Sequence, residues 1–144
     1  KPNNNLEISK SREKFFTRIC NYINVVGGKI LIFDYGYVTK PNTFTLQSIY
    51  NNKKSNILDN IGFQDISSLV DFTNLIDLAK INNLKVDFFS SQRKFLLEFG
   101  IKQRLEKILL NITNEESKII KSGVDRLINK DGMGTLFKVL VVSK

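Results

Sequence analysis

Residues 27–37 read Gly-Gly-Lys-Ile-Leu-Ile-Phe-Asp-Tyr-Gly-Tyr, and this stretch decides how the rest of the chain is interpreted. Its four consecutive apolar residues, 30–33, follow two glycines and are typical of a short strand. A continuous apolar run predicts a strand that is buried on both faces, as in the middle of a parallel sheet. The fold class that this strand indicates is therefore α/β.

Polar and aromatic residues follow the predicted strand. We expect the strand to end at Asp34, and Gly36 to allow a sharp turn. Ligands of open α/β sheets bind beyond the carboxyl ends of the strands, so Asp34, Tyr35 and Tyr37 are candidate site residues. The alternative is that Asp34 only begins a turn and that the tyrosines cover the end of the sheet.

The composition limits the classes of partner. The chain has 144 residues, enough for one domain, with 22 basic and 14 acidic residues and a net charge of +8. The basic residues are scattered along the chain and accompany no nucleic-acid-binding motif, so a solvated basic surface is favoured over a nucleic-acid footprint. No apolar stretch approaches the ~18 residues of a membrane span.

Several catalytic classes are excluded by the absence of histidine. Neither a Ser-His-Asp nor a Cys-His site can form within this sequence, and histidine metal sites are excluded as well, so no metal site is predicted. The only cysteine, Cys20, can form no internal disulfide. It lies on an apolar helical stripe, where a buried structural role is favoured over a nucleophilic one.

The remaining pattern alternates helices with strands. Residues 6–26 have a helical period and stop at Gly27, and residues 38–64 form a long irregular connection. A second helix follows, for which Asp65 or Ser68 can serve as the cap, and Ser68 with Asp71 fits the capping-box spacing. Residues 84–89 then alternate as a strand does.

The last third of the chain is predicted to be mostly helical. Short helices are expected at 91–99 and 101–110, with Gly100 as the stop between them. A third helix begins with Thr113 and Glu116 in a capping box. Residues 136–142 form the final apolar strand, after a turn at Gly132-Met133-Gly134. Strands separated by helices support the α/β class.

Several stretches, in this order, resemble one enzyme family. They include residues 7–9 (Glu-Ile-Ser), 28–37, 45–47 (Thr-Leu-Gln), 65–72 (Asp-Ile-Ser-Ser-Leu-Val-Asp-Phe), 91–101, 126–128 and 133–140. Together they are similar to the C-terminal half of the MidA-like class I S-adenosylmethionine-dependent methyltransferases. This family includes the mitochondrial arginine methyltransferase that assists assembly of respiratory complex I.

The resemblance implies a register and a missing half. Residues 30–34, 84–89 and 136–142 would be strands five, six and seven of a Rossmann-like sheet, with the last strand antiparallel and between the other two. The whole chain, 1–144, would be a single partial domain with a helical insertion at about 91–128. The family binds S-adenosylmethionine through its N-terminal half, so no cofactor binding is expected for this chain alone.

The resemblance also implies roles for single residues. Asp34 would hold a substrate guanidinium, with Tyr35 and Tyr37 as walls of the slot, because planar bidentate pairing suits that group. Asp65 and Gln92 are further candidates that could instead cap helices. For Asp71, helix capping is favoured over a site role.

The expected function is that of the C-terminal part of a protein methyltransferase, inactive alone, acting on an arginine of a respiratory-complex subunit. Its partners would be a protein substrate and a separate N-terminal half, in the bacterial cytoplasm or the mitochondrial matrix. Two alternatives are a non-catalytic interaction module and the remnant of a split gene.

Overall fold

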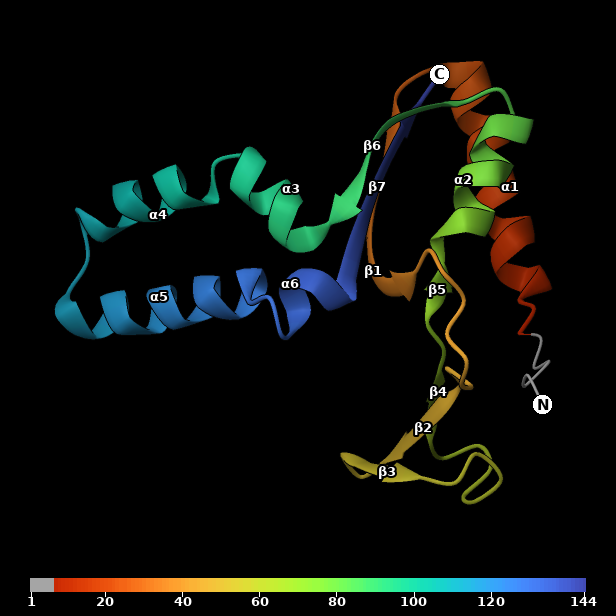
Figure 1. Cartoon of the computed structure of the whole chain (residues 1–144), viewed down its shortest axis with the longest axis horizontal. Helices are drawn as coiled ribbons and strands as arrows, with labels where there is room; N and C mark the ends of the chain where they lie inside the picture. The colour runs from red at the N-terminus through yellow and green to blue at the C-terminus, as the bar shows by residue number, and fades with distance from the viewer. Residues whose placement is uncertain (1–6) are drawn as a thin grey trace.

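A mixed α/β sheet forms the centre of the computed structural model, which describes residues 7–144. The sheet has the strand order β5-β1-β7-β6, with β1 at Lys29–Tyr37, β5 at Val70–Asp71, β6 at Lys85–Ser91 and β7 at Phe137–Ser143. Helices α1 (Lys10–Val26) and α2 (Phe72–Ile81) lie on one side of it (Figure 1). The α/β class is confirmed.

The last strand occupies the place that the resemblance implies. β7 pairs antiparallel with β1, from Lys29 opposite Ser143 to Tyr35 opposite Phe137. On its other edge β7 pairs antiparallel with β6. β7 therefore lies between the two other long strands, and the predicted antiparallel final strand is confirmed.

β1 differs from its prediction in burial and in length. Ile30 and Ile32 pack against the core, whereas Leu31 and Phe33 on the other face are exposed. The prediction of a strand buried on both faces is therefore wrong for this chain, because α1 and α2 cover only one face. The strand also continues through Asp34 as far as Tyr37, so Asp34 does not mark its end.

Gly36 is needed for close packing, and the predicted turn at this position is wrong. It lies within β1 and pairs with Val70 of the parallel strand β5. A Cβ atom at Gly36 would lie 2.1 Å from the carbonyl oxygen of Val70 and 2.8 Å from the ring of Phe72. Only glycine therefore lets β5 and the start of α2 approach β1 this closely.

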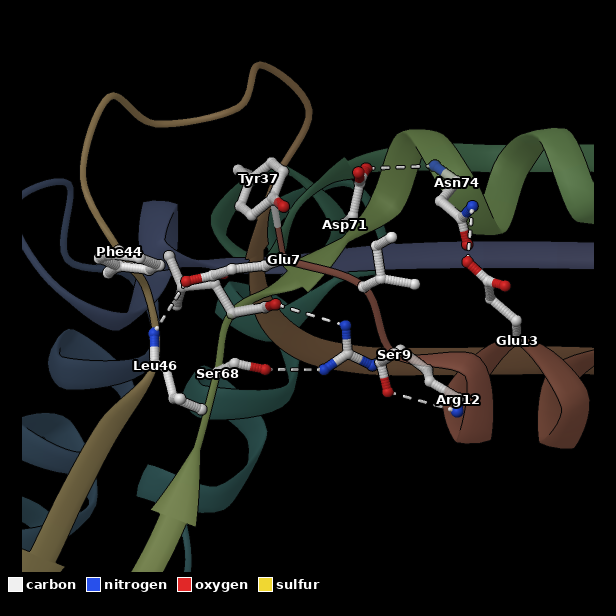
Figure 2. A pocket seen from close by; sticks show the side chains of 12 residues that line it. Glu7, Ser9, Arg12, Glu13, Tyr37, Phe44, Leu46, Ser68, Asp71 and Asn74 are labelled. Carbon is white, nitrogen blue, oxygen red and sulfur yellow. Dashed lines mark hydrogen bonds between the residues drawn. The ribbon is translucent and has the colours of Figure 1, made fainter. Parts of the chain in front are cut away.

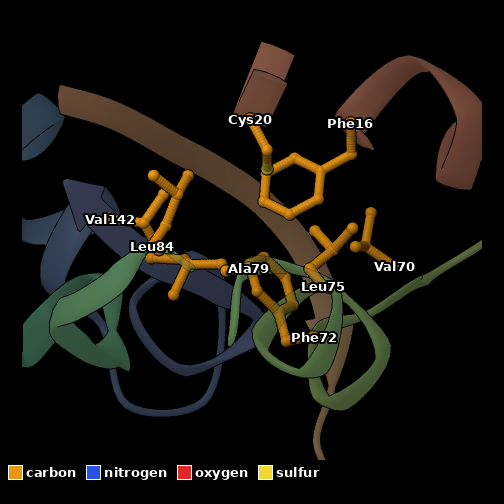
Figure 3. Packing of buried hydrophobic residues seen from close by; sticks show 9 residues of the cluster. Phe16, Cys20, Val70, Phe72, Leu75, Ala79, Leu84 and Val142 are labelled. Atoms are coloured by element: carbon orange, nitrogen blue, oxygen red, sulfur yellow. The ribbon is translucent and has the colours of Figure 1, made fainter. Parts of the chain in front are cut away.

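The hydrophobic core fills the space between the sheet and the two helices (Figure 3). Its buried members come from α1, α2, the sheet and the segments that join them: Phe16, Cys20, Val70, Phe72, Leu75, Ala79, Leu84, Leu140 and Val142. Cys20 is fully buried, and this burial raises the pKa of its thiol. The predicted structural role of Cys20 is consistent with this environment.

The connection at 38–64 is more regular than predicted. It contains β2 (Gln47–Tyr50) and β3 (Lys53–Ser55), which join β4 (Asp65–Ser67) in a small antiparallel sheet, the arm. Figure 1 shows this arm projecting from the end of the main sheet. Asp65 lies in β4 and pairs with Ile49, so its predicted capping role is wrong.

The cap of α2 is Asp71, whose Oδ1 accepts a hydrogen bond of 3.1 Å from the amide of Asn74. The capping role favoured for Asp71 is confirmed. The capping box predicted from Ser68 and Asp71 is wrong, because the helix begins three residues later than that spacing requires.

The helices expected in the last third of the chain are present. They are α3 (Gln92–Glu98), α4 (Ile101–Leu109) and α5 (Asn114–Ile128). Thr113 and Glu116 form the predicted capping box. The glycines at 132 and 134 flank the start of a further short helix, α6 (Met133–Leu136), where only a turn was expected. These helices lie on the side of the sheet opposite α1 and α2 (Figure 1).

The helical segment is joined to the sheet through aromatic rings. Phe95 of α3 makes edge-to-face contacts with Phe33 of β1 and Phe88 of β6, at centroid distances of 5.1 and 5.4 Å. It also stacks on Phe99 at 4.4 Å. Such contacts add to the free energy of apolar burial and fix the position of α3 against the exposed sheet face. Within residues 7–144, no helix combines the length and apolar character needed to cross a membrane.

Candidate functional site

A cavity of about 470 Å³ opens at the carboxyl ends of the parallel strands β1 and β5, where α1 and α2 begin (Figure 2). Its lining comes from three separate parts of the chain: Glu7, Ile8, Ser9, Arg12, Glu13, Tyr37, Phe44, Leu46, Ser68, Leu69, Asp71 and Asn74. The location is where α/β sheets bind ligands. It is therefore our candidate functional site.

Glu7 ties the segment before α1 to the segment before β2. Its Oε1 accepts hydrogen bonds from the amides of Thr45 (2.6 Å) and Leu46 (3.2 Å), and its Oε2 accepts one from the Thr45 hydroxyl (2.6 Å). We call this set of bonds the Glu7 clamp. Burial alone would raise the pKa of Glu7, but the clamp, helped by the charge of Lys40, lowers that pKa below its ordinary value.

A second set of hydrogen bonds fixes the link between β4 and β5. The Thr45 hydroxyl accepts from the amide of Leu69 at 3.0 Å, while the Arg12 guanidinium donates to the Leu69 carbonyl at 3.4 Å. Arg12 also donates to the Ser68 hydroxyl at 3.1 Å. Both backbone groups of Leu69 are thus satisfied, which holds the entry to β5, and hence Asp71, in place.

The lining carries an excess of negative charge. Its ionisable carboxylates are Glu7, Glu13 and Asp71, and its one guanidinium is Arg12, so the formal charge is 1 − 3 = −2. Glu13 accepts a hydrogen bond of 3.4 Å from the Asn74 side chain. Asp71 uses only Oδ1 as the helix cap, and its second oxygen has no partner among the described residues. The chain as a whole carries +8, so the negative cavity is a local exception.

Tyr37 lies near Asp71 and Glu7, as Figure 2 shows. Burial raises the pKa of its hydroxyl, and the charges of Asp71 and Glu7 raise it further against the opposing charge of Arg12. The hydroxyl therefore stays protonated at neutral pH and can both donate and accept a hydrogen bond.

Of the five candidate residues predicted from the sequence, only Tyr37 lines the cavity. Asp34 lies inside β1, where its Oδ1 accepts from the amide of Tyr35 at 2.8 Å. The ring of Tyr35 packs edge-to-face on Phe137. Gln92 is buried and donates to the Leu127 carbonyl at 2.9 Å, so it joins α3 to α5. Asp65 belongs to the arm.

The sequence interpretation did not assign a site role to the cavity residues before α1. The Glu-Ile-Ser stretch carried part of the family resemblance, but nothing in its local pattern places Glu7 beside Thr45, 38 residues away. For Asp71, helix capping was favoured over a site role.

Comparison with known proteins shows the family of the chain. A family model described as "Putative S-adenosyl-L-methionine-dependent methyltransferase" matches residues 1–90, which is more than half of the chain. The chain belongs to this methyltransferase family. The matched residues include every residue that lines the cavity.

Curated relatives carry one recurring name. A Xenopus tropicalis protein, "Protein arginine methyltransferase NDUFAF7, mitochondrial", is 30% identical over 98% of this chain and 33% of its own length. The mouse protein of that name is 36% identical over 77% of the chain and 25% of its own length. A Caenorhabditis elegans homolog is 32% identical over 72% of the chain and 24% of its own length. This methyltransferase-family chain thus spans about a quarter to a third of the length of these relatives.

Solved structures support the same fold. An uncharacterized protein from Burkholderia thailandensis superposes with a TM-score of 0.84 at 23% identity, over 95% of this chain and 38% of its own. A second Burkholderia thailandensis structure, bound to S-adenosyl-homocysteine, superposes with a TM-score of 0.79 at 22% identity. The superposition covers 95% of this chain and 36% of the other. At these identities the likeness shows the fold alone.

The family name implies S-adenosylmethionine, and the glycines of the described residues do not fit it. A Rossmann-like sheet binds such a nucleoside with a glycine-rich turn after the carboxyl end of a strand. Gly27 and Gly28 precede β1 at its amino end, and the open face of Gly36 is filled by Val70 and Phe72. Gly134 is likewise packed against the backbone of Ile128 and Asn129. Nor do residues 7–144 contain a cluster of three metal-ligating acidic or cysteine side chains.

Proposed function

We propose that the chain forms the substrate-side part of a protein arginine methyltransferase that uses S-adenosylmethionine. The candidate site is the pocket for the arginine side chain. The family membership and the names of the relatives support the reaction class. The position of the cavity, at the carboxyl ends of β1 and β5, supports its assignment as a ligand site.

The observation that carries the proposal is the charge of the cavity. A lining with a formal charge of −2 in a chain of +8 selects for a cationic ligand. The second Asp71 oxygen and the Tyr37 hydroxyl can accept hydrogen bonds from a guanidinium, whose donors form a planar fork. Arg12 offsets only one of the three carboxylate charges of the lining, and its guanidinium donates to Ser68 and Leu69.

The proposal assigns the methyl donor to another part of the complete enzyme. The poor fit of the described glycines, and the small fraction of each relative that the chain spans, support this division. We extend the proposal to a respiratory-complex subunit as the substrate protein, on the resemblance given by the sequence. The mitochondrial names of the relatives support a mitochondrial location.

Calorimetry with a pair of short peptides tests the pocket directly. One peptide carries arginine and the other carries citrulline at the same position, which keeps the shape of the guanidinium and removes its charge. We expect the arginine peptide to bind at least about tenfold more tightly, because a hydrogen bond to a charged group stabilises by about 1.5–3 kcal/mol. Equal affinity for the two peptides would contradict the assignment of this cavity to a cation.

A further inference from the structure

One side of the cavity is apolar and open to solvent. Ile8, Phe44 and Leu46 line it with exposed fractions of 60%, 63% and 42%. We call these three side chains the apolar wall. Isolated exposed apolar residues are ordinary, but three that line one cavity form a surface that a ligand can cover.

The Glu7 clamp joins the two segments that carry this wall. Glu7 is next to Ile8 in the chain, and its carboxylate binds the amides of Thr45 and Leu46 and the hydroxyl of Thr45. Thr45 lies between Phe44 and Leu46. The clamp therefore holds the backbone segments that carry the wall close together, which lowers the entropy cost of binding.

Phe44 and Leu46 of the apolar wall lie on a different side of the cavity from Asp71 and Glu13. In Figure 2 Phe44 and Leu46 are at one end of the cavity, Asn74 and Glu13 are at the other, and Asp71 lies between the two ends. A ligand that places a cation near Asp71 must therefore extend its neighbouring groups over the wall. A polar neighbour would lose water there without gaining a hydrogen-bond partner, whereas an apolar neighbour would gain burial.

We propose that the apolar wall selects the sequence around the target, so that the site takes an arginine with an aliphatic or aromatic residue directly beside it in the substrate protein. This inference rests on the proposed function and adds a specificity determinant to it. Phe44 and Leu46 are the specificity-determining residues, because they present the exposed apolar surface next to the charged part of the cavity.

Fluorescence anisotropy on the full 144-residue chain tests the inference with two labelled peptides, Gly-Leu-Arg-Leu-Gly and Gly-Ser-Arg-Ser-Gly. We expect the leucine peptide to bind about tenfold more tightly, because partial burial of its leucine side chains against the wall stabilises the complex. In the Phe44→Ser variant this advantage should fall to about threefold or less.

Phe63→Ser is the matched control. Phe63 is 82% exposed, lies in the loop between β3 and β4, and does not line the cavity. This variant should keep the full preference for leucine. Equal binding of both peptides to the unmodified chain would overturn the inference and leave the arginine pocket standing. A Phe44→Ser variant that weakens both peptides equally would overturn it too, whereas failure of both peptides to bind would overturn the proposed function itself.

Discussion

At the scale of single residues, Asp71 combines a structural and a proposed functional role in one carboxylate. One oxygen caps α2 and the other has no partner among the described residues, at the edge of the negative cavity. The two roles can be separated by chemistry. Asparagine caps a helix about as well as aspartate but carries no charge.

We therefore predict that Asp71→Asn leaves the free energy of unfolding within about 0.5 kcal/mol of the original, as chemical denaturation would measure. The same substitution should weaken the arginine peptide about tenfold in calorimetry. Asp71→Ala is the companion variant and should cost about 1 kcal/mol of stability as well. If Asp71→Asn left the peptide affinity unchanged, Asp71 would serve only as a helix cap.

Glu7 provides a pH-dependent prediction. Its pKa in the folded chain lies below the ordinary value of 4.5. The clamp therefore contributes stability that is fully present above pH 4.5 and is lost as the pH falls through the folded pKa. The Glu7→Gln variant should be less stable than the original at neutral pH, and this difference should shrink toward pH of about 2.

Urea denaturation at a series of pH values measures this difference in the free energy of unfolding. Thr45→Val removes the hydroxyl that donates to Glu7 Oε2. This variant should therefore reduce the part of the free energy of unfolding that is lost at acid pH. A difference between Glu7→Gln and the original chain that stays constant from neutral to acid pH would show that the clamp contributes nothing through its charge.

Residue roles were the part that sequence reasoning predicted least well. Asp34 was a reasonable candidate because apolar strands often end at a polar residue, yet β1 continues for three residues beyond it. The continuation depends on pairing with Val70 and Asp71, which come more than thirty residues later. The positions of Glu7 and Arg12 in the site likewise depend on hydrogen bonds to distant residues, Thr45 and Ser68. No local sequence pattern predicts such contacts.

At the scale of elements, the packing of β1, β5 and α2 depends on Gly36. A Cβ there would meet backbone at 2.1 Å, and backbone cannot move aside as a flexible side chain can. We predict that Gly36→Ala lowers the free energy of unfolding by at least about 2 kcal/mol. Thermal denaturation followed by circular dichroism would measure it.

Gly123, in the middle of α5, provides the matched control for the Gly36→Ala variant. A Cβ at this position would meet nothing within 4 Å, so alanine fits without strain. Gly123→Ala should raise stability by about 0.5–1 kcal/mol, because alanine is the better helix former. If Gly36→Ala were as harmless as Gly123→Ala, the close approach of β5 to β1 would be wrong.

The elements with clear end signals were predicted best. Gly100 separates α3 from α4, and the Thr113–Glu116 box begins α5, as the sequence indicated. The arm was missed because its strands are only three or four residues long. One signal was available. Asn51 and Asn52 both have positive φ, as a tight hairpin turn requires, and asparagine tolerates that region.

At the scale of the whole molecule, the main sheet has an open edge. β5 pairs with β1 only at Gly36 and Tyr37, so among the described residues no strand covers positions 29–35 on that side. Helix α1 lies over a face of the sheet and cannot pair with this edge (Figure 1). An unpaired apolar strand is a template for association with another strand.

We predict that the isolated chain self-associates through this edge. Amide hydrogen exchange should show an alternating pattern across 29–35 in dilute solution, because successive amides point to opposite sides of a strand. Light scattering should show larger species as the concentration rises. A stable monomer in which every amide of 30–33 is strongly protected would mean that the edge is closed in another way.

The central claim is a division of labour, in which this chain holds the arginine side chain and another part of the enzyme holds the methyl donor. Calorimetric titration of the isolated chain with S-adenosylmethionine tests it most directly. The account predicts no saturable heat at micromolar cofactor, because the described glycines offer no turn that fits the nucleoside. Micromolar binding of S-adenosylmethionine to this chain alone would contradict it.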